Sequence, residues 1–71
     1  MKTLGELTLE LGLAERTARW AGTMMEVGGK FMADPSVPVT IDDAQRIFDA
    51  YNDAAACWLT ILEYLRGNRS H

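Results

Sequence analysis

Few side chains in this sequence have types and spacings suited to catalysis or metal binding. A cysteine nucleophile needs a histidine nearby to activate it. The single histidine, His71, is the last residue of the given sequence, and nothing in its spacing predicts that it lies close to Cys57. Asp49 and Asp53 lie one helical turn apart, a spacing more typical of a solvated helix face than of a cation site. No glycine-rich phosphate loop and no cluster of cysteine and histidine is present. We therefore predict no enzyme activity, no metal and no cofactor.

The N-terminal half of the sequence is better suited to binding a partner than to catalysis. The stretch LGLAERTARWAG, residues 11–22, carries Arg16, Thr17 and Arg19 close to a tryptophan. Arginine binds phosphates and carboxylates, and tryptophan is frequent where proteins contact one another. These three polar residues are therefore candidates for contacts with a polar partner or with DNA.

The composition favours a folded acidic domain. Of the 71 residues, 48% are hydrophobic and 24% are charged, which is typical of globular chains. The net charge of −3 argues against a broad basic surface for nucleic acid. Glu6 and Glu10 interrupt any apolar run too early for a signal peptide, and no stretch is long and apolar enough for a membrane span. With a single cysteine and no disulfide, we expect a cytoplasmic protein.

One predicted loop divides the sequence into two helical arms. Two prolines within residues 33–39, ADPSVPV, divide the sequence into nearly equal arms of a single domain, residues 1–71. Thr40 has the character of an N-cap for the second arm, and Thr3 with Glu6 has the spacing of a capping box for the first. We predict an all-α fold with two main helices, residues 3–32 and 40–66.

Each arm carries two apolar stripes at helical spacing. What we call the heptad stripe recurs at alternating steps of three and four. It consists of Leu4, Leu7, Leu11, Ala14, Ala18, Ala21, Met25, Gly28 and Met32, and then of Ile41, Ala44, Phe48, Tyr51, Ala55, Trp58, Leu62 and Leu65. What we call the second stripe lies beside it and contains Leu13, Trp20, Met24, Val27 and Phe31, and then Ile47, Ala54, Cys57, Ile61 and Tyr64.

Folding the arms at the proline loop predicts an antiparallel hairpin held by the heptad stripe. Ala14 would then face Trp58, and Ala18 would face Ala55. The second stripe would be left uncovered, and the simplest cover is a second hairpin, which makes a four-helix bundle. The residues expected at this dimer or partner interface are Trp20, Met24, Val27, Phe31, Ile47, Ile61 and Tyr64.

An alternative is a small helix-turn-helix or winged-helix domain. The stretch TLGELTLELGLAERTARW resembles the opening of helix-turn-helix domains of the excisionase or MerR type. The resemblance implies a first helix that ends at Gly12 and a recognition helix that enters the major groove of DNA. Arg16, Thr17 and Arg19 would then contact bases or phosphates.

Two features favour one long helix over this alternative. Ala14 cannot cap a helix beginning after the turn, because it has no side-chain acceptor. The heptad stripe also passes through Gly12 without a change of phase. Whether the first helix is continuous through Gly12 and through Gly28 and Gly29 stays open, because glycine costs about 1 kcal/mol in a helix interior.

Our main functional expectation is a small protein-interaction module. Short chains without catalytic groups are often regulators, adaptors or inhibitors of larger proteins, phage proteins among them. We therefore expect a homodimer that binds and covers part of a larger, unidentified protein, with no membrane and no small-molecule substrate. The alternative is the DNA-binding regulator described above.

Overall fold

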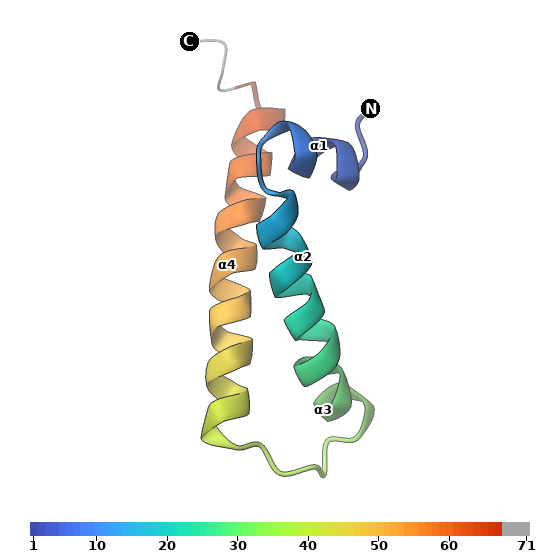
Figure 1. Cartoon of the computed structure of the whole chain (residues 1–71), viewed down its shortest axis with the longest axis vertical. Coiled ribbons are helices and arrows are strands. Elements are labelled where there is room, and N and C mark those ends of the chain that lie inside the picture. Colours follow the sequence, from blue (N-terminus) through green and yellow to red (C-terminus); the bar gives the residue numbers. More distant parts are fainter. Residues whose placement is uncertain (68–71) are drawn as a thin grey trace.

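The computed structural model describes residues 1–67, and no strand occurs among them. The helices are α1 (Leu4–Glu10), α2 (Ala14–Thr23), the π-helical segment η1 (Met24–Gly28), α3 (Gly29–Ala33) and α4 (Ile41–Leu65) (Figure 1). The prediction of an all-α fold is confirmed for the described residues.

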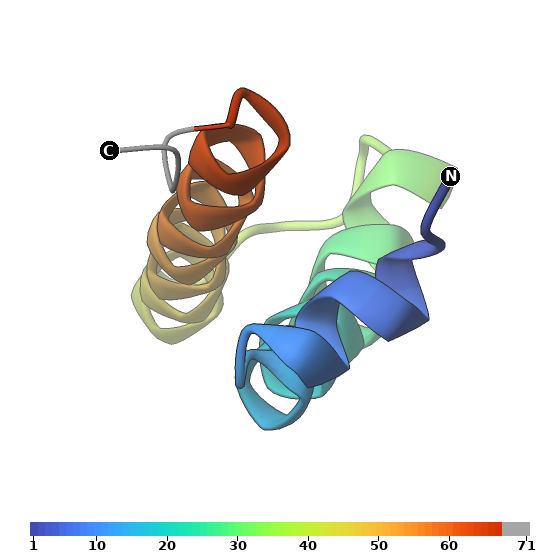
Figure 2. The ribbon, with the colours of Figure 1, turned by 90° about the horizontal axis from the view of Figure 1, so that it is seen from above.

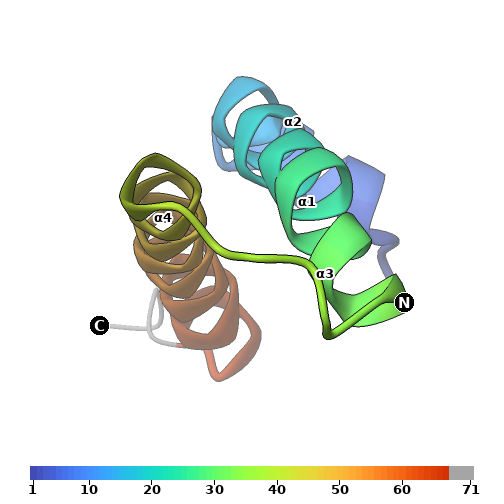
Figure 3. The same ribbon diagram turned by 90° about the horizontal axis from the view of Figure 1, so that it is seen from below.

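The chain forms an antiparallel hairpin with a short additional helix at its open end. The first arm, α2 through α3, runs beside α4 and diverges from it toward the loop at residues 34–40 (Figures 1 and 3). Seen from above, α1 lies across the beginning of α2 (Figure 2). Ion pairs between Arg16 and Asp53 and between Lys30 and Asp43 connect the two arms. They show that the arms run antiparallel, in a register within about one helical turn of the predicted one.

The helix starts agree with the sequence. The Thr3 hydroxyl accepts a hydrogen bond from the Glu6 backbone N–H at 3.1 Å, and the Glu6 carboxylate accepts one from the Thr3 N–H at 2.9 Å. The Thr40 hydroxyl accepts a hydrogen bond from the Asp43 N–H at 3.1 Å. Both predicted caps are confirmed, because each satisfies N–H groups that have no partner inside the helix.

The first arm is not one helix from residue 3 to residue 32, and this expectation was wrong. Gly12 has φ of 73°, in the left-handed region. The Leu13 N–H donates to the Thr8 carbonyl at 2.6 Å, and the Gly12 N–H donates to the Leu9 carbonyl at 3.3 Å. This pair of bonds is a Schellman motif, which ends a helix at a glycine. The buried contact between Leu7 and Leu13 accompanies it, so the turn is held by apolar packing as well.

Gly12→Ala is expected to lower the free energy of unfolding by about 1–2 kcal/mol, because only the left-handed backbone opposes the new methyl group. Nothing lies within 4 Å of a Cβ built at this position. Gly22→Ala is the matched control, since it has equal space inside α2 and should stabilise the chain by up to about 1 kcal/mol. Urea unfolding followed by circular dichroism measures both. Equal effects of the two substitutions would contradict the turn.

Gly28 and Gly29, in contrast, do not end the first arm. Both have right-handed helical angles, with φ of −70° and −58°. The backbone widens into a π-helical turn at Met24–Gly28 and then continues as α3. The helical path is therefore unbroken from Ala14 to Ala33.

The stripe that packs between the arms is the second stripe, and the prediction that the heptad stripe would hold the hairpin was wrong. Val27 and Ile61 of the second stripe are 8% and 2% exposed, and Cys57 is fully buried. In the heptad stripe, by contrast, Phe48 and Tyr51 are each 61% exposed.

Size complementarity explains this choice between the stripes. The first arm contributes bulky side chains to the interface, including Leu13 and Trp20, whereas α4 meets them with Ala50, Ala54 and Cys57. Large side chains against small ones let the helices approach closely and fill the space between them. The period of three and four residues is the same in both stripes, so it could not distinguish them.

Candidate protein-interaction face

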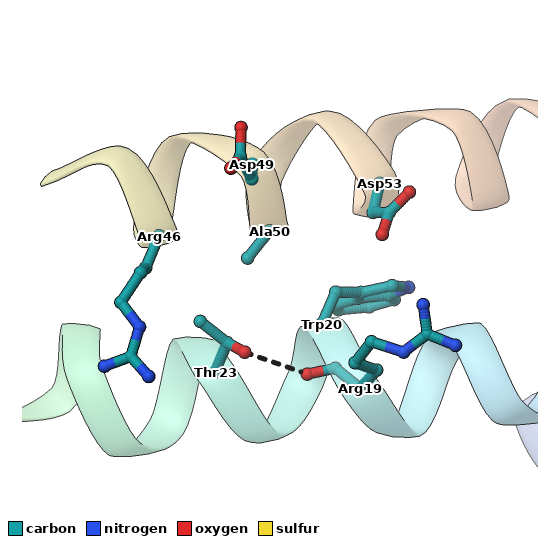
Figure 4. A pocket seen from close by; sticks show the side chains of 7 residues that line it. All are labelled: Arg19, Trp20, Thr23, Arg46, Asp49, Ala50 and Asp53. Carbon is teal, nitrogen blue, oxygen red and sulfur yellow. Dashed lines mark hydrogen bonds between the residues drawn. The ribbon is translucent and has the colours of Figure 1, made fainter. Parts of the chain in front are cut away.

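One side of the hairpin is polar. An open cleft on this side is lined by Arg19, Trp20, Thr23, Arg46, Asp49, Ala50 and Asp53 (Figure 4). Its charged members directly precede interface residues in the sequence: Arg19 precedes Trp20, and Asp49 precedes Ala50. On both arms, the residues that directly precede interface positions therefore lie on the polar side of the hairpin.

The charges on this polar side are largely paired with one another. The Arg16 guanidinium donates to the Asp53 carboxylate at 3.0 Å, and this hydrogen bond raises the pKa of Arg16. Arg19 lies 3.8 Å from Glu15, one turn earlier on α2. The Gln45 amide donates to Asp49 at 3.0 Å. Exposed pairs of this kind contribute little to stability, but they offset the positive charge of both predicted recognition arginines.

Thr17 does not lie on this surface. Its hydroxyl oxygen is buried, as is the Trp20 indole nitrogen, and neither has a hydrogen-bond partner among residues 1–67. Both side chains are only partly exposed and belong to the side of α2 that faces α4. The structure thus separates Thr17 from Arg16 and Arg19, and a role for Thr17 in reading DNA does not fit this placement.

The opposite side of the hairpin is apolar. In antiparallel helices, residues that directly follow interface positions share one side, just as residues that directly precede them share the other. Tyr51 follows Ala50, Ala55 follows Ala54, and Ala21 follows Trp20. The heptad stripes of both arms therefore lie next to each other on the side away from the cleft. We call this surface the apolar face.

The apolar face has two rows of different character. The row on α4 is large and exposed, since Phe48, Tyr51, Trp58 and Leu62 are all between 42% and 61% exposed. The row on the first arm is mostly small, with Met25 and Met32 as its only long side chains. The small members of that row are Ala14, Ala18, Ala21 and Gly28.

At the open end of the hairpin, α1 is tied to α4 by polar contacts. The Glu10 carboxylate accepts hydrogen bonds from the Lys2 ammonium and from the Tyr64 hydroxyl. These bonds lower the pKa of Glu10, with the Lys2 contribution the larger, and the hydrogen bond with Glu10 raises the pKa of Lys2. Beneath them, Leu7, Leu13, Cys57 and Ile61 form the buried core, with Leu11, Trp20 and Tyr64 packed against it. This core and the polar contacts above it hold α1 against the C-terminal end of α4.

The seven residues predicted for a dimer or partner interface lie between the two arms instead. Val27 and Ile61 are buried, and the other five are partly buried: Trp20, Met24, Phe31, Ile47 and Tyr64. Their stripe already packs within one chain, so an uncovered surface at these positions does not fit the structure. Sequence reasoning found both stripes but assigned the packing between the arms to the wrong one. The signal that was overlooked is Ala50, which with Ala54 and Cys57 makes a small-residue strip that accommodates the bulky first arm.

The remaining candidate groups show no convergent geometry. Cys57 is a fully buried thiol in the core, and His71 lies outside the described residues. Among residues 1–67, no three histidine, cysteine, aspartate or glutamate side chains are grouped as a metal would require. Within the same residues, no helix combines the length and apolar character needed to cross a membrane.

Comparisons of the chain with protein-family models, with curated proteins and with solved structures find no match. Among the surfaces of residues 1–67, the apolar face exposes a row of large hydrophobic side chains along α4.

Proposed function

We propose that this chain is a non-catalytic protein-interaction module whose apolar face pairs with a second copy to form a four-helix bundle. The observation that carries the proposal is the exposure of the heptad stripe of α4 from Ile41 to Leu65, in which every position is apolar. A surface helix normally turns such a stripe toward a core, because burying it removes apolar area from water.

The size of the apolar face supports an interface. With 25 residues, α4 is about 37 Å long. The molecule is 19 Å wide, so the whole side of the hairpin that carries the heptad stripes measures on the order of 700 Å² in projection, and the apolar face is part of it. Exposed apolar patches of several hundred Å² are typical of interaction sites, and each partner buries about 800 Å² in a stable complex.

Two neighbouring alanines of α4 provide the test. Ala55 and Ala56 are both exposed in the single chain, but Ala55 lies on the apolar face and Ala56 on the outer side of α4. Ala55→Glu would bury an unpaired carboxylate between two copies and weaken self-association on the order of a hundredfold or more. Ala56→Glu adds the same charge outside the interface and should leave self-association unchanged.

Sedimentation velocity at several concentrations measures the association, and circular dichroism checks that both variants remain helical. Identical sedimentation of the two glutamate variants and the parent chain would contradict the proposal. The further expectation of a larger target protein, which this module would regulate or inhibit, stays a prediction.

One observation favours the DNA-binding alternative, namely the turn at Gly12 between α1 and α2. The net charge of −3 and the engagement of Arg16 with Asp53 oppose it, since a DNA reader needs free positive charge for phosphates. Salt-sensitive binding of duplex DNA that is lost in Arg16→Ala would support this second function in place of the first.

A further inference from the structure

We infer that the two copies pair with the two-fold axis parallel to the helices, so that the first arm of each copy packs on α4 of the other. This inference rests on the proposed dimer and specifies its geometry. The alternative axis is perpendicular to the helices and would place each α4 against the α4 of the other copy.

The sizes of the two rows select between these axes. On α4 the row is built of large side chains, namely Ile41, Phe48, Tyr51, Trp58, Leu62 and Leu65, interrupted by Ala44 and Ala55. On the first arm it is built mainly of alanine and glycine. Pairing like arms would crowd two large rows together and leave the two small rows apart. Pairing unlike arms instead sets Trp58 and Tyr51 of α4 against alanines of the first arm, as close packing requires. The flexible side chains of Met25 and Met32 then meet the large side chains of α4.

The register of the hairpin makes this pairing specific. Rotation about an axis parallel to the helices keeps every residue at its own height. Residues side by side on the apolar face of one copy therefore face each other between copies. The ion pairs Arg16–Asp53 and Lys30–Asp43 fix these heights to within about one helical turn. In the register set by Lys30 and Asp43, Ala14 faces Trp58 of the other copy, and Ala18 faces its Ala55.

The same register places Ala21 opposite Tyr51, and Gly28 opposite Ala44. Trp58 and Tyr51 thus each face an alanine of the other copy, and each ring can pack flat against it. At Gly28 the backbone is helical and nothing lies within 4 Å of an added Cβ, so this position is open to the other copy. This rotation therefore avoids the crowding of aromatic rings that pairing α4 with α4 would produce.

Disulfide crosslinking between small residues tests the geometry with little disturbance of packing. Single-cysteine chains are made with Ala18→Cys, Ala55→Cys or Ala44→Cys, with the buried Cys57 replaced by alanine. If that replacement prevents folding, Cys57 is retained, because its full burial protects it from oxidation. Chains of different tag length are mixed, refolded together and oxidised mildly. The products are then separated on a non-reducing gel.

We expect the mixture of Ala18→Cys and Ala55→Cys chains to form mainly the mixed disulfide, because a disulfide needs the two Cβ atoms within about 4.5 Å. The mixture of Ala44→Cys and Ala55→Cys chains, which joins α4 to α4, should form little. The inference is overturned if positions 18 and 55 form no mixed disulfide, or if positions 44 and 55 form it in preference. If the parent chain still has the mass of a dimer in that case, the proposed function stands. A monomeric mass for the parent chain contradicts both.

Discussion

Ile61→Ala is expected to leave most of the chain unfolded at room temperature, whereas Leu62→Ala beside it leaves the helices formed. Ile61 is 2% exposed in the core beneath α1, and truncating a buried isoleucine costs about 2–5 kcal/mol. A single core in a chain of this size supplies only about 3–5 kcal/mol, so the loss consumes most of the available stability. Leu62 is 42% exposed on the apolar face, and its truncation removes few contacts within one chain.

Circular dichroism at 222 nm, recorded during urea unfolding at several protein concentrations, distinguishes the two variants. We expect the Ile61→Ala transition to shift to much lower urea, and the Leu62→Ala transition to depend mainly on protein concentration. Equal destabilisation by the two substitutions at every protein concentration would show that the heptad stripe packs within the chain, contrary to the structure.

Trp58→Ala is expected to weaken self-association by about thirtyfold or more while the helical signal is retained. Trp58 lies on the apolar face and is 48% exposed in the single chain, so pairing would bury the rest of its ring. Central tryptophans in interfaces commonly contribute about 2 kcal/mol or more, and 1.4 kcal/mol corresponds to a tenfold change in affinity. Thr60→Ala, on the polar side of α4, is the matched control.

Sedimentation equilibrium of both variants gives the dissociation constants directly. Unchanged association in Trp58→Ala would remove the aromatic row from the interface and with it the size argument for the pairing of unlike arms. Weakened association in Thr60→Ala would place the contact on the polar side instead.

Local signals in the sequence were sufficient for the helix starts and the loop. Thr3 and Thr40 cap their helices because a threonine hydroxyl accepts from backbone N–H groups two or three residues ahead, a bond decided within one turn. The prolines end the first arm for an equally local reason, since proline restricts the residue before it. The antiparallel hairpin follows from these signals and the short connection.

The break at Gly12 and the choice of stripe depended on contacts that the pattern does not contain. Leu11, Gly12 and Leu13 fit both a helix interior and a Schellman turn, and the buried contact of Leu13 with Leu7 decides for the turn. The stripe between the arms was decided by the volume of Trp20 against Ala50 and Ala54, a property of two helices together. The apolar face consists of the heptad stripes that this packing leaves exposed. Its position therefore could not be predicted before the stripe between the arms was known.

The molar mass of the parent chain in solution tests the central claim most directly. Sedimentation equilibrium at micromolar concentrations should give twice the 7.9 kDa of one chain, with dissociation on dilution. A mass of one chain throughout, with the apolar face of α4 still open to solvent, would contradict the account.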